Sequence, residues 1–273
     1  MALKLPGPLL LAGAGNMGGA LLAGWLERGL DPKMIVVQDP GPPPAMVALL
    51  AKYGIASQPT VTMERAPAVI LAAVKPQVMD QVFPTLAKFA GPETVTLSVA
   101  AGKTLAGFEK YLAAKSAVVR SIPNTPASVG RGITVCVANA HVTTAQRALC
   151  QLLLEAVGAV GWVEDEALID VATAVSGSGP AYVFLLAEAL AEAGRKAGLP
   201  ADLAAQLARW TVAGSGELLH RSDLPAAQLR QNVTSPNGTT YAALEVLMAE
   251  TGLQPLMDEA IAAATRRSRE LAS

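Results

Sequence analysis

The chain has 273 residues, a net charge of −1 and only two cysteines. This length is enough for one large domain or two ordinary domains with a substantial hydrophobic core. The balanced charge gives no electrostatic reason to expect binding to nucleic acid or to an anionic membrane. Two cysteines, Cys136 and Cys150, cannot make a disulfide framework, so we expect reduced thiols in a cytoplasmic protein.

Two apolar stretches could be mistaken for targeting or membrane segments. The N-terminal run is broken by Pro6, Gly7 and Pro8 and leads directly into a glycine motif, which argues against a signal peptide. The run at 181–194 is interrupted by Glu188 and Glu192, so it is too short for a membrane span. We therefore expect a soluble protein.

The first half of the chain alternates short strands with helices. Runs rich in β-branched and aliphatic residues predict strands at 9–13, 34–38, 68–74, 94–99, 117–122 and 133–138. Helical patterns lie between several of them, at 17–28, 45–53 and 143–157. Apolar strands separated by helices are typical of a mostly parallel sheet that is covered on both faces. We predict an α/β domain over residues 1–163.

From about residue 164 the strand patterns disappear. Apolar residues at spacings of three and four predict an amphipathic helix at 200–219. Further helices are predicted at 181–197, 240–250 and 253–270, punctuated by Gly198 and Gly252. The sequence thus predicts an all-helical domain over residues 164–273. Its helices are rich in Ala and Leu on nearly every face, more than one small bundle buries alone, so we expect at least a homodimer.

A glycine motif follows the first predicted strand. Gly13, Gly15 and Gly18 have the spacing G-x-G-x-x-G, and the motif opens a helix within a strand–helix–strand unit. This context favours a dinucleotide site, in which Gly13 makes the tight turn and Gly15 lets the pyrophosphate approach the backbone. Gly18 brings the helix close to the sheet, and the N–H groups at the helix start bind the phosphates.

Asp39 follows the second predicted strand. An acid at this position usually binds the adenosine ribose 2′-hydroxyl and repels a 2′-phosphate, and no arginine stands beside it. This predicts a preference for NADH over NADPH. Equally, Asp39 can simply cap the turn before Pro40.

Further motifs resemble one family, the pyrroline-5-carboxylate reductases, over nearly the whole chain. They are "GAGNMGGA" (13–20), "AAVKPQ" (72–77), "SVAAGKT" (98–104), "RSIPNTPASVGRGIT" (120–134), "AVSGSGPAYVF" (174–184) and "VTSPNGTT" (233–240). The resemblance implies a Rossmann-like dinucleotide-binding domain followed by an all-α dimerisation domain. It implies hydride transfer from NADPH or NADH to the C=N carbon of a cyclic imino acid, which gives L-proline, the last step of proline biosynthesis.

The resemblance also assigns residues to the cofactor. The implied cofactor contacts are Gly13, Gly15, Asn16, Met17, Gly18, Asp39, Thr60, Val74, Lys75, Pro76, Ala100, Ala101, Gly102 and Asn124. A lysine at a strand end can neutralise phosphate charge, although it can also be a solvated strand end. Small residues at 100–102 allow a close approach of the cofactor.

The remaining motifs are assigned to the substrate. Ser176 and Gly177 are implied to line the site, and Ser178 and Thr240 are implied to be catalytic. "TSPNGTT" contains no acid or base, but consecutive N–H groups at a helix start can hold a carboxylate. In the resemblance, Ser235, Asn237, Gly238 and Thr239 line this cradle, and the Thr240 hydroxyl faces the ring nitrogen. Asp223 is a weaker match to an acidic residue of the family.

Two other functions remain to be weighed. A 3-hydroxy acid dehydrogenase needs a catalytic lysine in its helical part, where Lys196 is the one candidate and sits beside Gly198. A non-catalytic nicotinamide-binding module would need no substrate motifs in the second domain. His141 and His220 are scattered and, with two separate cysteines, predict no metal site.

Overall fold

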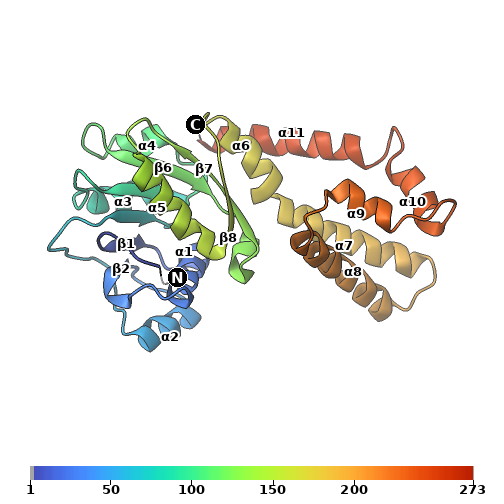
Figure 1. The fold of residues 1–273 in the computed structure, drawn as a ribbon, viewed down its shortest axis with the longest axis horizontal. Helices are drawn as coiled ribbons and strands as arrows, with labels where there is room; N and C mark the ends of the chain where they lie inside the picture. Colours follow the sequence, from blue (N-terminus) through green and yellow to red (C-terminus); the bar gives the residue numbers. More distant parts are fainter. Residues whose placement is uncertain (1–2, 273) are drawn as a thin grey trace. The chain divides into compact units, whose positions relative to one another are not determined.

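The computed structural model describes residues 3–272, which pack as two compact units (Figure 1). Unit 1 extends to Gly177 and resumes at Thr265, and unit 2 is Ser178–Ala264. The change from strands to helices falls between Trp162 and Leu168, close to the change of pattern in the sequence. The chain therefore has an α/β part followed by a helical part, as the sequence predicts.

The described part of unit 1 holds one eight-stranded sheet with the order β3-β2-β1-β4-β5-β6-β7-β8. The strands are β1 (Leu9–Ala12), β2 (Ile35–Gln38), β3 (Ser57–Gln58), β4 (Val69–Ala72), β5 (Val95–Ser98), β6 (Ala117–Ile122), β7 (Gly132–Ala138) and β8 (Gly158–Trp162). Every pairing is parallel except that of β6 with β7. All six predicted strands form, and the sheet gains β3 and β8 at its two edges.

Helices cover both faces of this sheet. They are α1 (Asn16–Glu27), α2 (Pro44–Tyr53), α3 (Pro76–Ala87), α4 (Leu105–Glu109), α5 (Thr144–Leu154) and α6 (Leu168–Ala172). Because side chains alternate along a strand, Leu9 and Leu11 of β1 face a cluster that includes Trp25 of α1 and Leu153 of α5. Leu10 and Ala12 of β1 face the opposite cluster, which includes Phe83 of α3 and Phe108 of α4.

The predicted helix at 143–157 is shorter than expected. α5 ends at Leu154, and Glu155–Val157 form a 3₁₀ turn that leads into β8. Gly158 follows with φ +148°, where a Cβ would overlap the carbonyl of Gly132. This backbone turn redirects the chain into a strand at the edge of the sheet.

The two cysteines lie inside the first core cluster as free thiols. Cys136 is on β7 and Cys150 on α5. Burial raises the pKa of the Cys136 thiol to about 12 and raises that of Cys150 as well. Both groups are therefore protonated packing residues near neutral pH.

The C-terminal part of the chain is helical. Its helices are α7 (Gly179–Lys196), α8 (Ala201–Arg221), α9 (Ala226–Asn232), α10 (Thr239–Leu247) and α11 (Leu253–Ala272). α7 and α8 pack against each other as an antiparallel pair (Figure 1). Four of these helices were predicted from the sequence, and α9 was not.

α11 begins in unit 2, and its final turns belong to unit 1. There Thr265 is buried, and the Ser268 hydroxyl donates to the carboxylate of Asp170 on α6 at 2.7 Å. The end of the chain therefore completes the first unit.

Candidate functional site

The glycine loop joins β1 to α1. Gly13 has φ +91°, and a Cβ there would lie 2.7 Å from the carbonyl oxygen of Ala73. A Cβ on Gly18 would overlap the carbonyl oxygen of Gly13. Both positions therefore require glycine for the fold of the loop itself.

Gly15 differs from the other two glycines. A Cβ built on Gly15 meets no atom within 4 Å, so open space lies over this part of the backbone. Gly15 is also the N-cap of α1, and no side chain caps this helix start. Asn16 and Met17 form its first turn, whose N–H groups lack intrahelical partners. The loop thus fits a pyrophosphate, since it combines open space with free N–H groups and the positive end of a helix dipole.

Asp39 lies at the end of β2 beside this loop. Its Oδ2 accepts a hydrogen bond from the Ala14 N–H at 2.7 Å, and its Oδ1 accepts one from the Gly41 N–H at 2.8 Å. Asp39 therefore does cap the turn after β2. It also holds this turn against the glycine loop, a contact between residues 25 positions apart in the sequence.

Three further segments, after β4, β5 and β6, reach the same edge of the sheet. β1, β4, β5 and β6 are mutually parallel, so their carboxyl ends lie along one edge, as does that of β2. The predicted cofactor residues that follow these strands directly are Gly13, Asp39, Val74, Lys75, Pro76, Ala100, Ala101, Gly102 and Asn124. Ligands of open α/β sheets bind at this edge, next to the switch in strand order at β1 and β4. Thr60 is exposed just after β3.

Asn124 has a role that the sequence analysis did not foresee. Its side chain is buried, donates to the carbonyl of Ser176 at 3.1 Å and accepts from the N–H of Ile133 at 2.9 Å. It therefore ties the turn after β6 to β7 and to the "SGSGP" segment. The family resemblance assigns Asn124 to the cofactor, and these two bonds fix the position of its side chain.

A charged cluster next to residues 100–102 was also missed. The Lys103 ammonium donates to the carboxylate of Asp80 at 2.8 Å, and the Tyr111 hydroxyl donates to the same group at 3.2 Å. The hydrogen bond from Lys103 lowers the pKa of the Asp80 carboxyl. Lys103 directly follows Gly102 in the motif "SVAAGKT". This position was the one feature of the sequence that could have marked Lys103 as part of the site.

The "SGSGP" segment forms an unusual helix junction. Thr173–Gly177 is a π-helical turn between α6 and α7, and π turns are often found at functional sites. The Ser176 hydroxyl donates to the carbonyl of Ala172 at 2.8 Å. Ser178 is the N-cap of α7, but its hydroxyl accepts no hydrogen bond from the N–H groups of the helix start.

In unit 2 the "TSPNGTT" segment leads into α10. Asn237 has φ +57°, in the left-handed region that Asn tolerates better than most residues. The Gly238 N–H donates to the carbonyl of Ser235 at 3.0 Å, and Gly238 is the N-cap of α10 with no side-chain cap. Thr239 and Thr240 form the first helical turn, and Thr240 is half-buried. The loop thus presents N–H groups at a helix start, as a carboxylate cradle requires.

Two other titratable residues of unit 2 that were considered for a catalytic role are exposed. Asp223 is exposed between α8 and α9. Lys196 is exposed at the end of α7, with its ammonium 3.6 Å from Glu192. Among residues 3–272 no group of three or more His, Cys, Asp or Glu side chains could hold a metal ion.

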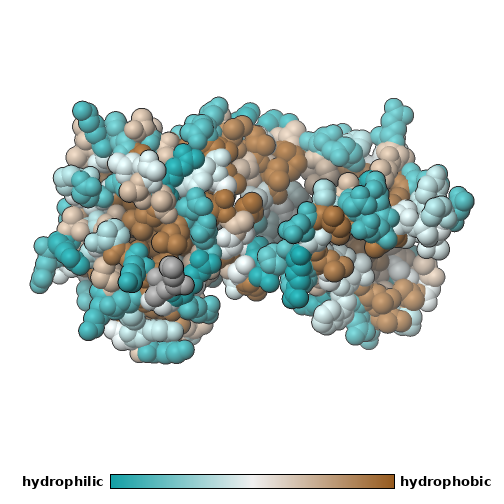
Figure 2. Space-filling model, in the orientation of Figure 1, coloured by the Kyte–Doolittle hydropathy of each residue, from teal (hydrophilic) through white to brown (hydrophobic). Residues whose placement is uncertain are grey.

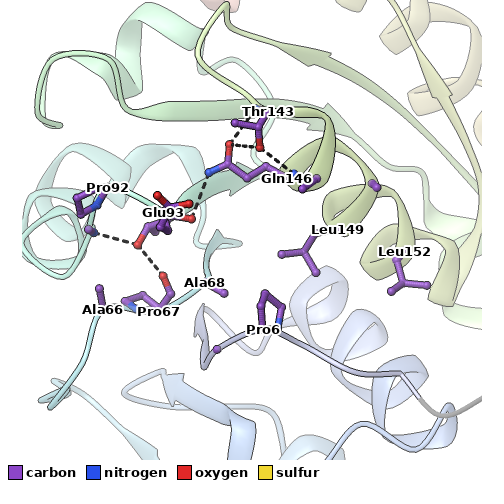
Figure 3. A pocket seen from close by; sticks show the side chains of 15 residues that line it. Pro6, Ala66, Pro67, Ala68, Pro92, Glu93, Thr143, Gln146, Leu149 and Leu152 are labelled. Atoms are coloured by element: carbon purple, nitrogen blue, oxygen red, sulfur yellow. Dashed lines mark hydrogen bonds between the residues drawn. The ribbon is translucent and has the colours of Figure 1, made fainter.

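A separate cavity of about 700 Å³ lies at the opposite, amino edge of the sheet (Figure 3). Its lining precedes β1, β4 and β5 and includes Leu149 and Leu152 of α5. The Gln146 amide donates to the carbonyl of Glu93, and the Thr94 hydroxyl donates to that of Pro67. These polar groups are used within the protein, and the cavity contains none of the predicted site residues.

Two family models match the chain. One, described as NADP oxidoreductase coenzyme F420-dependent, covers residues 9–102. The other, described as pyrroline-5-carboxylate reductase dimerisation, covers residues 166–271. They correspond to the nucleotide-binding sheet and to the helical part.

Curated relatives match nearly full length. The pyrroline-5-carboxylate reductase of Pseudomonas aeruginosa is 41% identical over 261 residues, 95% of each chain. That of Mycobacterium leprae is 39% identical over 285 residues, 96% of each chain.

Solved structures agree with these relatives. A pyrroline-5-carboxylate reductase from Coxiella burnetii has a TM-score of 0.89 at 34% identity, covering 98% of this chain and 100% of that chain. The Plasmodium falciparum enzyme, solved with NADP bound, has a TM-score of 0.76 at 27% identity, covering 98% and 99%. The family indicated by the sequence motifs is confirmed: this chain belongs to the pyrroline-5-carboxylate reductase family of NAD(P)-dependent oxidoreductases.

Proposed function

We propose that the protein reduces 1-pyrroline-5-carboxylate to L-proline, with the dinucleotide bound by unit 1 and the imino acid bound by the loop before α10. The observation that carries this proposal is the joint presence of an open glycine loop at Gly15 and an uncapped helix start at Gly238. The first suits a pyrophosphate and the second suits a carboxylate, so the chain provides for both reactants.

The cofactor residues have distinct tasks in this proposal. Gly15, Asn16 and Met17 hold the pyrophosphate with backbone N–H groups at the start of α1. Lys75, the N-cap of α3, is exposed and contributes positive charge at the same sheet edge. When bound, the reduced nicotinamide supplies a hydride. Asn124 acts by positioning the turn after β6 through its bonds to Ser176 and Ile133.

The substrate has one carboxylate and one imine nitrogen. In the proposal the N–H groups of Thr239 and Thr240 at the start of α10 bind the carboxylate, with Asn237 supplying the left-handed turn before them. The hydroxyls of Thr240 and Ser178 bind the ring nitrogen and keep it oriented. The reacting form is the iminium, in which the imine nitrogen has taken up a proton from water. Hydride adds to the C=N carbon, the C=N π electrons move to nitrogen and neutralise its charge, and the proton stays as the N–H of the product amine. Catalysis then depends mainly on orientation rather than on a strong acid or base.

A direct assay tests this proposal. Loss of reduced-nicotinamide absorbance on addition of 1-pyrroline-5-carboxylate, with proline as the product, is the expected result. The alternative reactions are checked in the same assay with 3-hydroxy acids and oxidised cofactor. Oxidation of a 3-hydroxy acid without reduction of the imine would reject the proposal, as would cofactor binding without turnover of either substrate.

The surface of unit 2 supports a homo-oligomer. Among residues 178–264, the buried hydrophobic side chains are those of Ala204 and Ala208. By contrast, Phe184 on α7 is 62% exposed, and Trp210 on α8 is 69% exposed. Hydrophobic residues, shown in brown, reach the surface over α7 and α8 (Figure 2). A surface this apolar indicates an interface.

A membrane is the other environment that could cover such a surface. Among the described residues, one continuous helical stretch, Leu168–Lys196, is long and apolar enough to cross a membrane by length and composition alone. A single helix of this kind is weak evidence, and Glu188 and Glu192 are inside it. The dimerisation model covers the same stretch, so we infer that a second copy covers α7 and α8 in the cytoplasm.

This inference predicts the mass of the particle in solution. Light scattering at micromolar concentration is expected to give at least twice the 28.0 kDa of one chain. Phe184→Glu is expected to shift the protein toward smaller species because it puts a charge into the interface. Glu192→Gln, on the same helix, is the control and should leave the mass unchanged. A fully active monomer would contradict the inference.

A further inference from the structure

The turn after β2 contains the features that bear on the choice between NADH and NADPH. Asp39 is half-buried and fixed on all sides: its N–H donates to the carbonyl of Gln58 at 2.9 Å, and its carbonyl accepts from the Ser57 hydroxyl at 2.8 Å. Its carboxylate is held by the N–H groups of Ala14 and Gly41. The negative charge therefore has a fixed place beside the glycine loop, at the sheet edge where the adenosine ribose of a bound dinucleotide lies.

The same turn has few hydrogen-bond donors for a phosphate. Residues 39–44 read "DPGPPP", and the four prolines have no N–H. The two N–H groups that remain, on Asp39 and Gly41, donate to Gln58 and to the Asp39 carboxylate. Pro43 and Pro44 are the N-cap and first residue of α2, so two of the N–H groups that a helix start can offer to a 2′-phosphate are missing.

The turn has no positive charge either. No Lys or Arg occurs between residues 34 and 51, and the next basic residue, Lys52, is at the far end of α2 with its ammonium over the Tyr53 ring. A 2′-phosphate carries roughly two negative charges near neutral pH. Next to the Asp39 carboxylate it would meet repulsion with no cation and no free N–H in this turn to offset it.

A ribose with free hydroxyls fits the same place. A carboxylate has about four positions at which it can accept a hydrogen bond, and Asp39 uses two of them for the N–H groups of Ala14 and Gly41. The other two can accept from the 2′- and 3′-hydroxyls of an adenosine ribose. Because the protein bonds already fix the carboxylate, the ribose does not have to order it.

We propose that Asp39 and the proline-rich turn at 40–44 make the enzyme prefer NADH over NADPH. The preference rests on the proposed dinucleotide site of unit 1. By comparison, the Plasmodium falciparum relative was solved with NADP bound.

The effect of the missing positive charge can be tested by adding one at Gly41. A Cβ on Gly41 meets no atom within 4 Å, and Gly41 is not among the glycines with positive φ, so a side chain fits there. Gly41→Arg adds a guanidinium beside the ribose position, and Gly41→Gln adds a long side chain without charge. Asp39→Asn removes the negative charge while keeping one acceptor and nearly the same size.

The measurement is the dissociation constant of NADH and of NADPH for each protein, by titration calorimetry without substrate. The wild type is expected to bind NADH at least about tenfold more tightly, a difference of about 1.4 kcal/mol. Asp39→Asn is expected to reduce this ratio to within roughly threefold, and Gly41→Arg should tighten NADPH at least about tenfold relative to Gly41→Gln. Thermal unfolding of each variant checks that the fold is intact.

The outcomes separate this inference from the proposed reaction. Wild-type protein that binds NADPH as tightly as NADH would overturn the preference, whether or not it reduces the imine. Equal NADPH affinity in Gly41→Arg and Gly41→Gln would also overturn it. Protein that prefers NADH but does not reduce 1-pyrroline-5-carboxylate would uphold the preference and reject the proposed function.

Discussion

Gly15→Val is expected to abolish measurable dinucleotide binding while leaving the fold intact. No atom lies within 4 Å of a Cβ at this position, so the valine Cβ meets no protein group and lies in the open space over the loop. A bound pyrophosphate has to approach this backbone closely, and the two methyl groups would prevent it. We expect a loss of at least about 100-fold in affinity for NADH, which corresponds to about 2.7 kcal/mol.

The stability of this variant distinguishes a blocked site from a damaged fold. Gly15 is the N-cap of α1 with φ −73°, which valine can adopt, so the loss of stability should be about 1 kcal/mol. Gly161→Val on β8 is the matched control, because a Cβ there also meets nothing within 4 Å. Dinucleotide affinity should be unchanged in the control. Normal NADH binding by Gly15→Val would show that the pyrophosphate does not lie over this loop.

Substitutions in the loop before α10 are expected to impair imine reduction selectively. Thr240→Ala removes the hydroxyl proposed to bind the ring nitrogen, and should lower kcat/KM by roughly tenfold or more, since about 1.4 kcal/mol of lost transition-state contact is tenfold in rate. Gly238→Val should have a larger effect, because its Cβ would overlap the Ser235 hydroxyl and lie 3.2 Å from the Ser235 carbonyl oxygen. The loop must then rearrange, and the carboxylate cradle is lost.

Two measurements on each variant separate substrate effects from cofactor effects. The dissociation constant of NADH should stay within about twofold of the wild type for both variants, because the glycine loop is intact. Thr240→Ser keeps the hydroxyl and should retain most of the activity. If Thr240→Ala instead weakened NADH binding and left imine reduction unchanged, the loop before α10 would have a structural role only.

The fold could be predicted in proportion to how strongly each segment is buried. The central strands β1, β4, β5 and β6 are buried at every position, and a continuous apolar run identifies such a strand. The edge strands β3 and β8 gave no such signal. Ser57–Gln58 is two residues long, and Gly158–Trp162 has no buried residue and contains two glycines. Pairing with the sheet, rather than local propensity, makes these segments strands.

The helix α3 was a further omission, and its prolines account for it. α3 starts at Pro76 and contains Pro84, so its sequence reads as interrupted. Its buried residues Met79, Phe83 and Leu86 nevertheless lie at helical spacing and pack on the sheet. The amino-acid composition of Thr173–Gly177 does not indicate a π turn, because this conformation depends on how α6 and α7 are joined.

The features of the site can likewise be divided into those that the sequence predicts and those that depend on tertiary contacts. The glycine loop was predictable because its spacing has a direct physical reason, and the left-handed backbone at Asn237 follows from the chemistry of Asn. The hydrogen bond by which Asp39 holds the glycine loop was not predictable, because its partner Ala14 is remote in sequence. The two bonds of Asn124 likewise depend on tertiary contacts with Ile133 and Ser176. The substrate loop was assigned by family resemblance, since no acid, base or metal ligand marks it.

The return of the chain to unit 1 has a consequence for synthesis on the ribosome. The buried carboxylate of Asp170 has its partner in Ser268, and Thr265 completes the buried surface nearby. Translation runs from the N-terminus. The last turns of α11, which belong to unit 1, are therefore made only after the whole of Ser178–Ala264. During that interval the carboxylate of Asp170 bonds to water instead of to Ser268, and the unit lacks the net contribution of this hydrogen bond, about 1 kcal/mol. The nucleotide-binding unit therefore reaches its final stability after the helical unit has emerged, although it is encoded first.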